Sequence, residues 1–215
     1  MKNIGSRYTA RRLAVYFIGL IILSLGIDLN TKTKLGIAPV ISVASNISVI
    51  TGVMLGLVTF LYYVFMIFLQ ILIKKKEFKL WQFLQVPCAF VTSAVMQIFD
   101  MIIPTPDSLA MRLVFLAGAV LLTAAGAGVV VAMNIVPNPA DGLAAAVGEM
   151  FGKDYGFGKN IIDFTAIVIA LVLGWIFTGG ILGIGIGTVI SMICIGRVAA
   201  LLRGCFARIY DWTQK

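Results

Sequence analysis

Six long apolar runs dominate the chain, separated by short stretches that are polar or contain glycine and proline. They lie at residues 13–29, 53–73, 80–103, 112–133, 161–177 and 181–202. Apolar residues are continuous within each run, which is typical of buried or lipid-facing helices and not of the alternating strands of a membrane barrel. Each run is close to the ~20 residues that a helix needs to cross a bilayer. The pattern therefore predicts six transmembrane helices.

Two further apolar segments, residues 36–50 and 137–150, are shorter than a membrane crossing. Their length suits re-entrant helices that enter and leave on one side, or interfacial helices on the membrane surface. A proline stands near the start of each, and proline is well tolerated in the first turn of a helix. Both alternatives stay open. The candidate hinge positions in these segments are Gly36, Pro39, Pro139 and Gly142.

The composition supports a membrane setting. Of the 215 residues, 60% are hydrophobic and 12% are charged, whereas a soluble domain is about half apolar and about one quarter charged. No polar stretch is long enough to fold separately. We therefore expect residues 1–215 to form a single all-α membrane domain with lipid as its main surroundings.

The net charge of +8 is carried by three basic clusters. These are Lys2, Arg7, Arg11 and Arg12; Lys74, Lys75, Lys76 and Lys79; and Arg197, Arg203, Arg208 and Lys215. Clusters beside apolar runs follow the positive-inside rule and do not suggest a nucleic-acid partner. All three reach the cytoplasm only if both short segments fail to cross. The expected protein is thus a bacterial inner-membrane protein with both termini cytoplasmic.

A shift of 100 residues superimposes the two halves of the chain. It aligns Gly26 with Gly126, Pro39 with Pro139, Gly52 with Gly152, and Gly56 with Gly156. The first three long runs also map onto the last three without a gap. Because each half has three crossings, halves at about residues 1–103 and 112–203 would be inverted repeats, as in many secondary transporters.

Ionisable side chains within membrane segments are costly and suggest function. Asp141 and Glu149 lie eight residues apart on one helix face, and Asp163 lies one turn into the fifth long run. We predict ion coupling for these three acids. For Asp163 an exposed ion pair with Lys159 at the cytoplasmic end is an equally weighted alternative.

Uncharged polar residues complete the candidate site. The predicted substrate-binding residues are Ser42, Asn46, Gln97, Asn138 and Asp141. The alternative role for these side chains is helix capping and hydrogen bonding between helices. Asp28 is expected at the membrane interface near Lys32, and Asp100 in a structural pair with Arg112.

Several kinds of chemistry find no support in the sequence. There is no histidine, no HExxH motif, no nucleotide-binding motif and no paired acids at a catalytic spacing. We expect no enzymatic activity, no metal and no cofactor. Cys88, Cys194 and Cys205 lack metal or redox spacing and are read as small packing residues. Glycines four residues apart at 179, 183 and 187 predict close helix packing in the last run.

Two short motifs carry a family resemblance. The chain reads Leu35-Gly36-Ile37-Ala38-Pro39 in the first half and Leu182-Gly183-Ile184-Gly185-Ile186-Gly187-Thr188 in the last run. With these motifs it resembles the YczE/YyaS/YitT-type bacterial integral membrane proteins. The second half keeps the acid of that family's Pro–aromatic–Asp pattern in Pro139-Ala140-Asp141, and the first half, with Pro39-Val40-Ile41, does not. The resemblance implies location and architecture more than activity.

These features favour a secondary transporter or exporter of an unidentified small solute. Its halves would rock around a central site at the two proline-started hairpins, with Asp141 taking up a proton or cation and Asn46 and Asn138 contacting the solute. The alternative is a non-transporting membrane subunit or scaffold that binds a solute or a partner protein. A homo-oligomer is left open.

Overall fold

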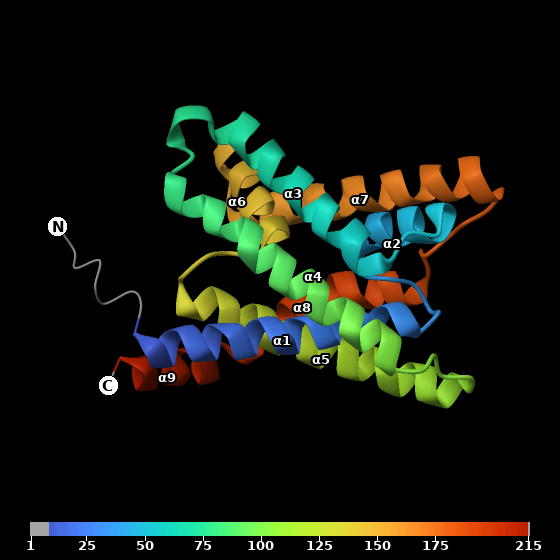
Figure 1. Cartoon of the computed structure of the whole chain (residues 1–215), viewed down its shortest axis with the longest axis horizontal. Helices are drawn as coiled ribbons and strands as arrows, with labels where there is room; N and C mark the ends of the chain where they lie inside the picture. The colour runs from blue at the N-terminus through green and yellow to red at the C-terminus, as the bar shows by residue number, and fades with distance from the viewer. Residues whose placement is uncertain (1–8, 215) are drawn as a thin grey trace.

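A computed structural model describes residues 9–214, and every regular element in this range is helical. The all-α fold predicted from the sequence is confirmed. In chain order the helices are α1 (Ala10–Lys32), α2 (Pro39–Thr51), α3 (Leu55–Lys74), α4 (Gln85–Ile102), α5 (Leu109–Met133), α6 (Pro139–Met150), α7 (Tyr155–Thr178), α8 (Ile186–Leu201) and α9 (Arg203–Thr213) (Figure 1). Two 3₁₀ turns, Lys75–Glu77 and Leu80–Leu84, connect α3 to α4.

Within the described residues, five helices are long and apolar enough to cross a membrane. They are α1, α3, α4 with its preceding turn, α5 and α7. The sixth, α8, has only 16 residues and reaches a spanning length only together with α9, from which it is bent by 53°. The short helices α2 and α6 have 13 and 12 residues, as the sequence predicts for segments that do not cross.

The last run differs from its predicted helix at its start. Residues 181–185 are not helical, and α8 begins at Ile186. The reason is a backbone pairing with the segment before α2: Ile37 N–H donates to the carbonyl of Gly183 (2.8 Å), and Gly187 N–H donates to the carbonyl of Leu35 (2.8 Å). Non-helical backbone is tolerated at membrane depth when its polar groups are satisfied inside the protein.

Glycine makes this pairing possible. A Cβ atom on Gly36 would lie 2.5 Å from the Gly185 nitrogen, and one on Gly185 would lie 2.4 Å from the Leu35 oxygen. Gly36 also has a φ of +117°, which disfavours any side chain. The sequence predicted that these glycines pack helices together. In the structure they instead allow two non-helical segments to approach each other backbone to backbone.

Helices α1 and α5 lie side by side over much of their length and run antiparallel (Figure 1). Two glycines allow their close approach. A Cβ on Gly26 would lie 2.4 Å from the Thr123 nitrogen, and a Cβ on Gly126 would lie 2.4 Å from the Leu23 nitrogen. The 100-residue shift turns one contact into the other, because it maps Gly26 onto Gly126 and Leu23 onto Thr123.

The 100-residue shift also relates the contacts of the two short helices to each other. Helix α2 packs against α7, and α6 packs against α3, so each short helix contacts a long helix of the other half. Helices α1 with α4 and α5 with α8 form another exchanged pair of contacts.

The helix connections gather at two ends of the bundle (Figure 1). At one end, an ion pair between Lys74 Nζ and Glu149 (2.9 Å) joins α3 to α6, and the Thr9 hydroxyl donates to the Thr213 carbonyl (3.3 Å), joining α1 to α9. The α3–α4 connection, with Lys75, Lys76 and Lys79, and helix α9, with Arg203 and Arg208, lie at this end. Lys2, Arg7 and Lys215 lie outside the described residues. The α1–α2 and α4–α5 connections lie at the opposite end.

This arrangement predicts which sites a membrane-impermeant maleimide reaches. In a variant whose three native cysteines are replaced, we expect Lys76→Cys and Lys153→Cys to react from one side of the membrane and Thr51→Cys and Asp107→Cys from the other. All four positions are exposed. Labelling of residues 51 and 76 from the same side would contradict an α3 that crosses the membrane.

Candidate functional site

The first turns of α2 and α6 contribute to one buried cluster in the interior. Val40 and Ile41 of α2 belong to the same buried cluster as Ala140 and Leu143 of α6. Each helix has its proline at the first position, where the missing N–H leaves no intrahelical bond unmade. The two short helices therefore point their N-terminal ends toward each other across the bundle.

The two helix starts are satisfied differently. At α6 the Asn138 side chain accepts from the Ala140 N–H (3.0 Å) and caps the helix. At α2 the residue before the proline is Ala38, which has no capping side chain. Its N–H donates instead to the side chain of Asn30 on α1, whose amide nitrogen donates to the Ser191 hydroxyl on α8 (3.0 Å).

A buried pair of glutamines lies at the start of α6. Gln70 Nε2 donates to Gln85 Oε1 (3.1 Å), Gln85 Nε2 donates to Gln70 Oε1 (3.0 Å), and Gln70 Nε2 also donates to the Pro139 carbonyl (3.0 Å). Both side chains are fully buried. Gly142 makes room for them, because a Cβ there would lie 2.6 Å from Gln70 Oε1. Neither glutamine was selected from the sequence, although each is a polar residue in an apolar run, the same signal that selected Gln97.

Asn46 joins α2 to the opposite half. Its amide nitrogen donates to the carbonyls of Ala170 on α7 (2.8 Å) and Leu182 (3.0 Å). Its side-chain oxygen is buried without a hydrogen-bond partner and lies close to Gly183, where a Cβ would be 2.6 Å away. One turn earlier the Ser42 hydroxyl donates to the Pro39 carbonyl (2.6 Å). Asn46 thus places an unused acceptor inside the bundle.

The other predicted polar residues lie farther along the helices. Gln97 on α4 accepts from the Gly56 N–H (2.7 Å) and caps α3. Asp141, which is half-buried, accepts from the Tyr155 hydroxyl (2.7 Å). Their predicted part in solute binding stays a prediction.

Each of the three acids predicted to couple ions has a partner. Besides the Tyr155 contact of Asp141, the Glu149 carboxylate pairs with Lys74, and its side chain is 61% exposed. Asp163 pairs with Lys159 one turn earlier, as the alternative for that residue anticipated, but its carboxylate is buried and not exposed. Their predicted coupling role stays a prediction.

The expectations for two other acids are wrong. Asp28 is not interfacial: its side chain is fully buried. Asp100 pairs with Lys32 (2.7 Å) and not with Arg112, whose guanidinium donates to the Pro106 carbonyl (3.1 Å). The sequence places Asp28 near a helix end, but Ser24 and Lys32, one turn to either side on the same face of α1, both contact α4.

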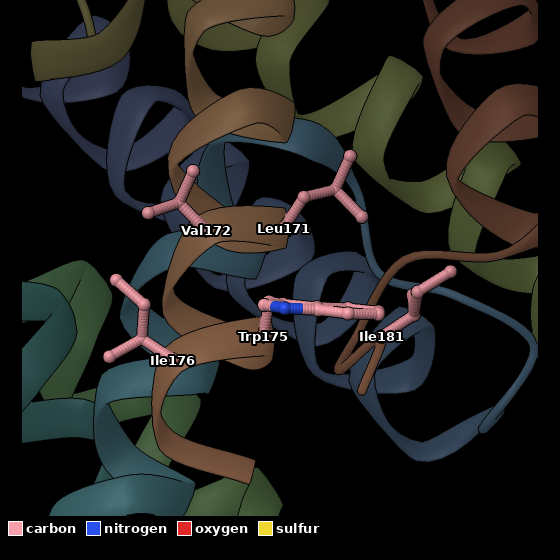
Figure 2. Close-up of a pocket in the computed structure, with 5 residues that line it drawn as sticks. All are labelled: Leu171, Val172, Trp175, Ile176 and Ile181. Atoms are coloured by element: carbon pink, nitrogen blue, oxygen red, sulfur yellow. The ribbon is translucent and has the colours of Figure 1, made fainter. Parts of the chain in front are cut away.

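One surface groove is of another kind. An open groove of about 420 Å³ near the end of α7 is lined only by apolar side chains, Leu171, Val172, Trp175, Ile176 and Ile181 (Figure 2). Such a surface on a membrane-crossing helix suits lipid acyl chains and offers no polar group to orient a solute. The polar groups that can do so lie at the tips of α2 and α6.

The fold and this interior define a polytopic helical membrane protein with two short helices that start inside the bundle. The chain belongs to DUF6198, a family of unknown function whose model matches residues 10–204. No curated protein and no solved structure matches it.

Proposed function

We propose that the protein is a small-molecule secondary transporter or exporter that works by alternating access. The observation that carries the proposal is the placement of the two short helices: their first turns share one buried cluster, while each packs on a long helix of the other half. Solute bound between the tips would contact both halves and would favour whichever relative position of the halves encloses it.

We further propose that residues 1–103 and 112–203 are inverted repeats. The exchanged contacts Gly26–Thr123 and Leu23–Gly126 support this, as does the antiparallel course of α1 and α5. Rocking of one half against the other around a site near the middle of the membrane is the usual mechanism for this plan.

The chemistry of the tips suggests a polar solute without a net positive charge. The buried groups at the start of α6 are the amides of Gln70 and Asn138, and Asn46 adds another amide two turns into α2; helix N-termini carry partial positive charge. Asp141, the acid in the first turn of α6, is half-buried and accepts from the Tyr155 hydroxyl. The wider proposals, a bacterial inner-membrane location with cytoplasmic termini, kinship with YczE/YyaS/YitT-type proteins and no enzymatic activity, agree with this picture.

Thermal-shift screening of purified protein against polar and anionic metabolites tests the proposal, because a bound ligand raises apparent stability. A hit is then followed as uptake into proteoliposomes. We expect Asp141→Asn to lower gradient-driven uptake at least several-fold, and Asp107→Asn, an exposed aspartate in the α4–α5 connection, to leave it unchanged. Normal gradient-coupled uptake by Asp141→Asn would remove Asp141 from the mechanism.

The alternative is a non-transporting subunit or scaffold that binds a solute or a partner protein. The spaced glycines of the last run could serve such a subunit as a contact face, but Gly185 and Gly187 approach the chain's own backbone at Leu35 and Gly36. Solute binding without uptake by the reconstituted protein, together with co-purification of a second protein, would favour the alternative.

A further inference from the structure

The carboxylate of Asp28 is isolated inside the protein. Its side chain is fully buried, and neither carboxylate oxygen has a hydrogen-bond partner. The acids Asp163, Asp100 and Glu149 have lysine partners. Asp28 differs from them because no described cation lies within ion-pair distance of it; the Lys32 ammonium is bonded to Asp100 and acts on Asp28 only from farther away.

Its position follows from the helix repeat. Residues 24, 28 and 32 lie on one face of α1. The Ser24 hydroxyl donates to the Thr92 carbonyl on α4 (3.0 Å), and Lys32 Nζ bonds both the side chain and the carbonyl of Asp100 on α4 (2.7 Å each). Asp28 therefore lies between these two contacts, at the interface of α1 and α4.

The interface at this level combines apolar side chains with unused hydroxyls. Met96, midway between Thr92 and Asp100 on α4, is fully buried in the same cluster as Ile27. Thr59 on α3 and Ser93 on α4 also bury hydroxyls that have no hydrogen-bond partner. Their helices are in contact here, because a Cβ on Gly56, one turn before Thr59, would lie 2.8 Å from the Ser93 carbonyl.

The charged and titratable groups on the surrounding helices do not pair with Asp28. Lys32 on α1 is held by Asp100, and Arg112 on α5 by the Pro106 carbonyl. Arg197 on α8 is exposed. The remaining titratable groups on α1 and on the helices packed against it are Arg11, Arg12 and Tyr16 on α1, Cys88 on α4, and Arg203, Cys205, Arg208, Tyr210 and Asp211 on α9.

We propose that Asp28 is a proton-binding site that is occupied in this conformation. An ionised carboxylate buried without a cation or a hydrogen-bond donor is strongly disfavoured, and such a group takes up a proton instead. Release of the proton requires water or a cation to reach the α1–α4 interface.

The Lys32–Asp100 pair is placed to control that access. It lies one helical turn beyond Asp28, toward the end of the bundle that holds the α1–α2 and α4–α5 connections, and its side chains are 14% and 31% exposed. Separation of the pair would admit water to Asp28 and would free the Lys32 ammonium to act as its counter-ion. The proton would then leave to the solvent at this end.

Infrared spectroscopy of protein labelled with ¹³C at its aspartate carboxyl groups tests the proposal directly. At neutral pH we expect the wild-type protein in lipid bilayers to show the C=O stretch of a protonated aspartic acid, shifted by the label and by D₂O. Asp28→Asn, which is nearly isosteric, should lose this band, and Asp107→Asn should keep it. Absence of the band from the wild type, or its persistence in Asp28→Asn, would overturn the proposal.

Two further measurements keep the test independent of the variant's folding. In wild-type protein the band should disappear only at alkaline pH and should not respond to Na⁺ or K⁺ at constant pH. Loss of the band on addition of either ion would overturn the proposal in favour of a cation site.

A role for Asp28 in coupling rests on the proposed transport function and can fail separately. The wild type could show the band and Asp28→Asn lose it, while solute uptake does not respond to a pH gradient. That result would support the proton-binding site and contradict proton-coupled transport.

Discussion

Alanine at Gly126 is expected to lower the thermal unfolding midpoint of the protein more than alanine at a loosely packed glycine of α5. A Cβ at residue 126 would lie 2.4 Å from the Leu23 nitrogen and 2.6 Å from its Cα. These are backbone atoms of a neighbouring helix, which cannot rotate away, so α1 and α5 must move apart. Overpacking of this kind costs about 1–3 kcal/mol, and here the strain falls on a long interface. Gly26→Ala meets the Thr123 nitrogen at 2.4 Å and should behave alike.

Gly118 provides the matched control on the same helix. A Cβ there would have only an ordinary contact, 3.6 Å from Leu29 Cδ1, and alanine favours helix over glycine by about 1 kcal/mol in water. Gly118→Ala should therefore unfold at or above the wild-type temperature in the same detergent. Equal unfolding midpoints for Gly118→Ala and Gly126→Ala would contradict the close contact between α1 and α5 at Gly126.

Much of the architecture could be predicted because apolar length is a strong signal in membrane proteins. Five of the six long runs are spanning helices, and both short segments are separate helices that start at the predicted Pro39 and Pro139. Helix starts were predictable where a proline marks the first turn. The asparagine cap of α6 at residue 138 was predictable for the same local reason.

What the sequence did not reveal depends on contacts between distant segments. The run that contains Gly183 and Gly185 has helical hydropathy, but its backbone pairs with residues 35–37, and no local signal reports that partner. The burial of Asp28 is similar, because its position near a helix end and its closeness to Lys32 suggest an exposed group. Lys32 is instead committed to Asp100, almost 70 residues away, which leaves the carboxylate without a partner.

Substitution of Gln70 by leucine should destabilise the protein substantially and weaken any solute binding at the tip of α6. The change conserves volume but leaves the Gln85 amide and the Pro139 carbonyl without their donor and acceptor. An unsatisfied buried polar group costs about 1–3 kcal/mol. Gln85→Leu should have a smaller effect, since Gln70 keeps its bond to Pro139. The thermal or denaturant-induced unfolding of each variant in one detergent measures the difference.

The double variant Gln70→Leu with Gln85→Leu tests whether the two amides hydrogen-bond mainly to each other or each to other groups. If the amides chiefly satisfy each other, the double variant should be more stable than the sum of the single losses predicts, with a coupling of roughly 0.5–3 kcal/mol. Additive losses would contradict a closed pair and would mean that each amide has another partner. The distinction matters for transport, because a closed amide pair at a helix start can open to hydrogen-bond a polar solute. A variant in which both amides are replaced would then keep most of its stability while losing the ligand-induced rise in unfolding temperature.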